Sequence, residues 1–152
     1  MQLEKSLKQQ KPFPSGKQKL VVNILYTQNW LSRKIDESFR GTDVTTQQYN
    51  ILRILRGQHP KPATVNLLVD RMIDKMSNAS RLVDRLYKKG YVDRVKNTVD
   101  RRAVDVTITS KGLDFLSVMD ARMNAMTENL FELTEAETEQ LNFLMDKMRG
   151  KE

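Results

Sequence analysis

The feature that most constrains this chain is a change in the spacing of its apolar residues at Gly90. Before this glycine, from Ala79 to Leu86, apolar residues recur every three or four positions, which is typical of a helix. After it, apolar and polar residues alternate over 91–95 and again over 104–108, which predicts two strands. We therefore expect a mainly α-helical chain with one small β-hairpin, a wing, whose long tip is charged.

Helical patterns occupy most of the chain outside this hairpin. The expected helices cover residues 17–40, 45–57, 64–74, 77–90, 110–131 and 134–149. Two of them start with a capping-box pattern, in which Thr45 is followed by Gln48 and Thr134 by Glu137. Ser77 is the expected N-cap of the helix that ends at Gly90. Residues 1–16 are polar and contain two prolines, which predicts a flexible tail before a single domain over 17–149.

The order of elements over residues 45–109 is that of a winged helix-turn-helix. Two short helices are joined by a tight turn near Lys75 and Met76, and the hairpin follows directly. The second short helix is the candidate recognition helix, because polar residues oppose its buried line at 100° per residue. These candidate DNA-binding residues are Ser77, Asn78, Ser80, Arg81, Arg85 and Lys88.

The residue types on this face suit DNA. Arginine reads guanine with two hydrogen bonds, asparagine reads adenine, and serine and lysine hold phosphates. The alternative is that they form the ordinary solvated face of an amphipathic helix. The distribution of charge favours DNA, because residues 71–102 hold ten basic and four acidic residues, whereas residues 110–152 hold five basic and nine acidic ones. The net charge of +7 over 152 residues is thus placed mainly on the helix and hairpin that would touch DNA.

The sequence lacks the residues that several other classes of function require. The chain has no cysteine and one histidine, His59 in a proline-flanked loop, so we expect no thiol chemistry, no metal site, no cofactor and no enzymatic activity. No apolar run exceeds three residues, which predicts neither a membrane span nor a secretory signal and places the protein in the cytoplasm. A winged-helix module that binds proteins rather than DNA is the alternative function, and it would need an apolar or acidic recognition helix.

The stretch over residues 77–94, SNASRLVDRLYKKGYVDR, resembles the recognition helix and first wing strand of the MarR family of winged helix-turn-helix transcriptional regulators. The segment DRR at 100–102 and the segment VTITSKG at 106–112 are similar to the wing tip, the second wing strand and the next helix start. The likeness covers about residues 17–149. It implies that the wing arginine, Arg102, enters the minor groove and that Asp100 orients it by a salt bridge. Arg101 is a further candidate DNA-binding residue at the wing tip, and Arg94 either orients the wing or faces a phosphate.

The resemblance also implies partners. Family members are dimeric bacterial regulators, more often repressors than activators, so residues 17–40 and 110–149 are expected to form the dimer interface. The partner would be double-stranded DNA with a palindromic operator. A small organic effector, aromatic or phenolic, would bind between the dimer helices and the winged domain, where Tyr26, Trp30 and Tyr49 are candidates for its pocket. Plain core packing is the favoured alternative for these three aromatics, and a member without a ligand is a further alternative.

Overall fold

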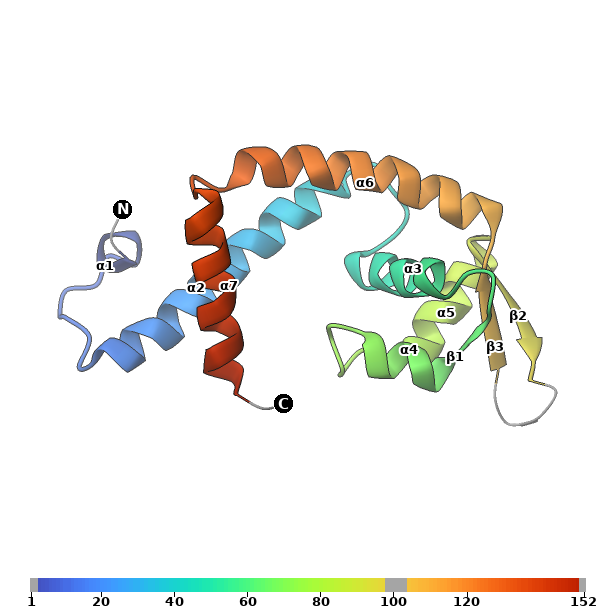
Figure 1. Ribbon diagram of the computed structural model, residues 1–152, viewed down its shortest axis with the longest axis horizontal. Helices are drawn as coiled ribbons and strands as arrows, with labels where there is room; N and C mark the ends of the chain where they lie inside the picture. Colours follow the sequence, from blue (N-terminus) through green and yellow to red (C-terminus); the bar gives the residue numbers. More distant parts are fainter. Residues whose placement is uncertain (1–2, 98–103, 151–152) are drawn as a thin grey trace.

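The computed structural model describes residues 3–97 and 104–150, and the described part is mainly helical with one small antiparallel sheet (Figure 1). The elements are α1 Leu3–Ser6, α2 Gly16–Ser38, α3 Thr46–Gln58, β1 Ala63–Thr64, α4 Val65–Arg71, α5 Ala79–Lys88, β2 Val92–Lys96, β3 Val104–Ile108, α6 Ser110–Leu130 and α7 Glu135–Arg149. The predicted fold class, a helical chain with a small wing, is confirmed.

The sheet has three strands in the order β1-β3-β2, all antiparallel. Val106 is the central residue, paired with Arg94 of β2 on one side and with Ala63 of β1 on the other. The sequence predicts only β2 and β3. Strand β1 has two residues and follows Pro62, so it is too short to show an alternating pattern.

Side chains cap the starts of α2, α3, α4, α5, α6 and α7, and at α5 the capping residue differs from the predicted one. Both predicted capping boxes are present, Thr45 with Gln48 on α3 and Thr134 with Glu137 on α7. The prediction that Ser77 caps α5 is wrong. Asn78 is the N-cap, and its side-chain oxygen accepts a hydrogen bond from the Arg81 amide at 3.0 Å.

The core lies where the winged domain meets the first half of α6. Its fully buried side chains include Ile51 and Leu52 of α3, Leu86 of α5, and Leu116 and Met119 of α6. Helix α6 lies against the sheet at Gly112, where an added Cβ would be 2.5 Å from the Tyr91 carbonyl oxygen and 2.6 Å from Ile108 Cγ1. The glycine thus permits the close contact that joins the long helix to the wing.

Helix α6 leaves the winged domain and leads to α7, while α2 packs along its far part (Figure 1). Within the described chain, α2 and α7 hold no buried residue, although both carry many apolar side chains. These exposed apolar residues are Leu20, Val21, Leu25 and Tyr26 of α2 and Leu141, Phe143, Leu144 and Met148 of α7.

The N-terminal segment differs from the flexible tail that its composition predicts. It contains the short helix α1, whose Leu3 is buried. Glu4 of this helix forms an ion pair with Lys19 of α2 at 2.7 Å, and the hydrogen bond from Lys19 lowers the pKa of Glu4. Lysine and glutamate fifteen positions apart gave no local pattern from which this contact could be predicted.

Candidate nucleic-acid interface

Helix α5 separates its apolar and polar residues sharply. Ala79, Val83 and Leu86 are buried in the core, while Leu82 is half-buried. On the opposite face Ser80, Arg81, Arg85 and Lys88 are exposed, as is the N-cap Asn78. The helix therefore presents a polar and basic face to its surroundings, and only Ser77 of the predicted set is partly covered.

A shallow pocket of about 240 Å³ brings four of the predicted residues together at the start of α5. Its lining consists of Ser77, Asn78, Arg81, Leu82 and Arg85, with Thr45 and Gln47 from the start of α3. Ser80 and Lys88 are exposed but do not line it. The Ser77 hydroxyl is engaged in the turn, since it donates a hydrogen bond to Asp74 Oδ2 at 2.6 Å.

Arg94 of β2 is tied to α5. Its guanidinium forms an ion pair with Asp84 and lies over the Tyr87 ring, 4.4 Å from the ring centroid. Both partners lie on α5, so this arginine fixes the first wing strand against α5. Sequence reasoning missed Tyr87. Asp100, Arg101 and Arg102 lie outside the described residues.

A polar cluster at the base of the wing joins it to the loop between α2 and α3. The Tyr91 hydroxyl donates a hydrogen bond to Asp43 Oδ1 at 2.8 Å. Burial and this hydrogen bond raise the pKa of Tyr91 to about 12. Lys89 donates to the Asp43 carbonyl oxygen, and Lys111 Nζ lies 4.4 Å from the Tyr91 ring centroid. These contacts join three segments far apart in the sequence, which no local pattern predicts.

The winged domain is also held to α6 by an ion pair. Arg56 of α3 donates hydrogen bonds to both carboxylate oxygens of Asp120, at 2.5 and 3.3 Å. The hydrogen bond to Asp120 raises the pKa of Arg56. Because the two side chains are 36% and 40% exposed, solvent weakens this attraction.

The comparison with known proteins decides the family. The MarR family model matches residues 44–104, which contain the winged domain up to the start of β3. The transcriptional repressor MdtR of Bacillus subtilis is 33% identical over 113 residues, which cover 74% of this chain and 72% of MdtR. The chain belongs to the MarR family. Its fold and its winged helix-turn-helix are those of this family of transcriptional regulators.

Solved MarR-type structures share the fold along nearly the whole chain. A MarR transcription factor from Planctomyces limnophilus is 30% identical, has a TM-score of 0.68, and spans 88% of this chain and 98% of its own. The organohalide-sensing regulator RdhR-CbdbA1625, in its 2,4-dichlorophenol-bound form, is 20% identical with a TM-score of 0.80, covering 93% of this chain and 86% of its own. These structures therefore share the fold of this chain over most of its length.

The structure does not gather the three aromatic residues predicted for an effector pocket. Tyr26 is exposed on α2, and Trp30 packs on Phe131 with ring centroids 6.3 Å apart. Tyr49 is buried in the core, edge-on to Phe39 at 5.2 Å. Tyr49 does not line a pocket itself but contacts Phe39, which does.

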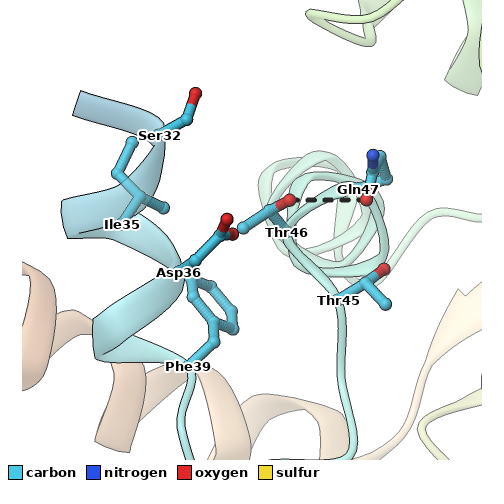
Figure 2. Close-up of a pocket in the computed structure, with 7 residues that line it drawn as sticks. All are labelled: Ser32, Ile35, Asp36, Phe39, Thr45, Thr46 and Gln47. Carbon is cyan, nitrogen blue, oxygen red and sulfur yellow. Dashed lines mark hydrogen bonds between the residues drawn. The ribbon is translucent and has the colours of Figure 1, made fainter. Parts of the chain in front are cut away.

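That pocket, of about 510 Å³, lies between the end of α2 and the start of α3 (Figure 2). It is lined by Ser32, Ile35, Asp36, Phe39, Thr45, Thr46 and Gln47. Figure 2 shows the Asp36 carboxylate on the same side as Thr46, whose hydroxyl donates to Gln47 Oε1 at 3.3 Å. An apolar floor beside several polar groups suits a small organic molecule with a hydroxyl group.

Two further classes of site receive no residues from the described part of the chain. Within residues 3–97 and 104–150, no three histidine or acidic side chains gather closely enough to hold a metal ion. The helices that the structure describes include none with a stretch apolar enough for a membrane span.

Proposed function

We propose that this MarR-family protein is a homodimeric repressor that binds a palindromic DNA operator in the cytoplasm and is released by a small organic effector. The exposed polar and basic face of α5 carries the proposal. Its Arg81 and Arg85 are of the types that read base edges, and Lys88 and Ser80 are of the types that hold phosphates, while the side-chain oxygen of Asn78 caps the helix. In this arrangement α5 lies in the major groove and the wing arginine, Arg102, lies in the minor groove.

A second copy of the chain would cover the apolar residues of α2 and α7. These helices carry apolar side chains at helical spacing yet hold no buried residue in the described chain. A surface of this kind is typical of an obligate interface between subunits. Two-fold symmetry would then place the two recognition helices about one turn of DNA apart, ~34–36 Å, on a palindromic site.

The pocket between α2 and α3 is the candidate effector site. It lies between a proposed dimer helix and the first helix of the winged domain, so a ligand there would bear on their relative position. Ile35 and Phe39 offer an apolar surface, and Asp36 offers a hydrogen-bond acceptor for a hydroxyl group. The structural neighbour RdhR-CbdbA1625 binds 2,4-dichlorophenol, an aromatic phenol of the class that we propose.

Capture of genomic fragments by the purified protein, followed by gel shifts, tests the proposal. We expect the wild-type protein to select discrete fragments, each with a palindromic element, and to retain them at moderate salt. Arg85→Ala should weaken binding to these fragments by at least tenfold. Lys11→Ala removes a positive charge from the N-terminal segment, outside both the winged domain and the proposed dimer helices, and should leave binding unchanged. Loss of all binding at low salt in the wild-type protein would contradict the proposal.

A further inference from the structure

Two large apolar side chains in the turn between α4 and α5 are held almost completely in solvent. Ile73 is 89% exposed and Met76 is 93% exposed, whereas the next most exposed large apolar residue of the described chain, Phe143, reaches 63%. A single exposed apolar residue is normal, but two within four positions, nearly free of contact, need a reason.

The turn that carries them is built of specific hydrogen bonds. The Asp74 side chain accepts two of them, from the Met76 amide at 3.0 Å and from the Ser77 hydroxyl at 2.6 Å. The Ile73 amide donates to Asn50 Oδ1 of α3 at 3.0 Å. Lys75 donates to the Asp70 carbonyl oxygen at the end of α4. The backbone is therefore fixed on both sides of the two side chains, and their exposure follows from a defined turn.

The position of the turn indicates what the side chains would touch. Met76 directly precedes Ser77 and Asn78, which line the pocket at the start of α5 together with Arg81. In Figure 1 the turn lies on the side of the winged domain away from α6. Exposed Arg71 precedes the turn and exposed Arg81 follows it, so a polyanion is favoured over an apolar protein surface.

We propose that Met76, with Ile73 beside it, contacts the 5-methyl groups of thymines in the major groove at each half-site. The proposal rests on the proposed function and names a specificity determinant for it. The thymine methyl is the one apolar group that a base pair presents in the major groove, and apolar side chains are its usual partners. Methionine suits this contact because its flexible thioether adapts to an irregular surface.

Deoxyuridine substitution tests the contact, since it removes only the 5-methyl group. An operator selected from random duplexes by the wild-type protein is resynthesised with deoxyuridine at one thymine pair at a time, symmetrically in both half-sites. We expect one such position to cost the wild-type protein about fourfold in affinity per half-site, which corresponds to one buried methyl group. Met76→Ala should bind the unmodified operator more weakly and lose less than twofold on the same substitution.

Two more variants serve as controls for this test. Met76→Leu keeps an apolar side chain of similar size and should retain the sensitivity to deoxyuridine. Leu7→Ala truncates an exposed apolar residue of the N-terminal segment, outside the winged domain and the proposed dimer helices, and should behave as wild type. All variants should keep the wild-type mass in solution and the wild-type thermal midpoint, because Met76 contributes almost no buried surface.

The outcomes that overturn the inference differ from those that overturn the proposed function. A wild-type protein that binds its operator but tolerates deoxyuridine at every thymine refutes the methyl contact alone. So does a Met76→Ala variant that pays the full deoxyuridine penalty, or one that dissociates into monomers, which would place Met76 against the partner chain. A wild-type protein that selects no DNA refutes the proposed function and this inference with it.

Discussion

The hydroxyl of Tyr91 donates a hydrogen bond to the carboxylate of Asp43 across 48 positions of sequence, at 2.8 Å. Tyr91 stands at the entrance to the first wing strand, and Asp43 lies in the loop between α2 and α3. The contact therefore ties the wing to the segment that leads from the proposed dimer helix into the winged domain. It fixes the position of the wing relative to the loop between α2 and α3.

Removal of this hydroxyl should destabilise the fold in a pH-dependent way. Tyr91→Phe is expected to lower the free energy of unfolding by about 1 kcal/mol at neutral pH, measured by urea denaturation. The pKa of Tyr91 is about 12 in the folded chain and 10.0 in its ordinary state. The stabilisation is thus complete below pH 10 and is lost as the pH rises toward 12. The difference in the free energy of unfolding between wild type and variant should narrow between pH 10 and pH 12. A difference that stays constant would contradict the hydrogen bond from the Tyr91 hydroxyl to Asp43.

Gly112 should reject even one methyl group. A Cβ at this position would lie 2.5 Å from the Tyr91 carbonyl oxygen, which belongs to backbone and cannot rotate away. We expect Gly112→Ala to lower the free energy of unfolding by about 1–3 kcal/mol. Gly57→Ala is the matched control, because open space surrounds Gly57 in α3, and it should gain about 0.5 kcal/mol. Equal thermal midpoints for the two variants would contradict the close contact of α6 with the wing.

Variants of Arg94 and Asp84 can distinguish two roles for Arg94: positioning the wing against α5, or binding a DNA phosphate directly. If Arg94 acts through α5, Arg94→Ala and Asp84→Ala should weaken operator binding to a similar extent and across all sequence variants. Anisotropy titrations at several salt concentrations check this, because loss of a phosphate contact lowers the salt dependence by about one ion. We expect no change in salt dependence for Asp84→Ala. A reduced salt slope for Arg94→Ala alone would show that Arg94 binds a phosphate instead.

The ion pair between Arg56 and Asp120 should stabilise the junction of α3 and α6 only modestly. Since both side chains are more than one third exposed, a double-mutant cycle with Arg56→Ala and Asp120→Ala should give a coupling energy of about 0.5 kcal/mol. The coupling should shrink in 1 M salt, where charges are screened within about 3 Å. A coupling energy above about 2 kcal/mol would contradict the structure, because it would require an ion pair much less exposed to solvent.

The sequence predicts those features that local chemistry determines. Thr45 and Gln48 announce the start of α3 because the capping box needs only residues three positions apart. At α5 the same reasoning selects the residue before the true N-cap. Serine is a good N-cap, but the Ser77 hydroxyl donates its hydrogen bond to Asp74, and Asn78 caps the helix instead. Local patterns rank candidates without knowing which tertiary or turn partner competes for them.

In the candidate site, too, the sequence predicts the features that depend on local spacing and misses those that depend on tertiary contacts. The polar face of α5 follows from its helical period, and the structure exposes Arg81 and Arg85 on it. The pair of Tyr91 with Asp43 and the pocket at Phe39 depend on segments that meet only in three dimensions. Tyr26, Trp30 and Tyr49 illustrate the limit, because aromatic character alone does not distinguish an effector pocket from core packing: Tyr49 lies in the core, whereas Tyr26 is exposed.

The central claim is that two copies of α5 read one palindromic operator by direct contact with bases. The measurement that tests it most directly is the affinity of the wild-type protein and of Arg81→Ala for every single-base variant of the selected operator. We predict two symmetric blocks of sensitive positions, about one helical turn apart, with one position per half-site where Arg81→Ala loses its preference. A flat profile, or an equal loss by Arg81→Ala on every variant, would contradict direct readout by this helix.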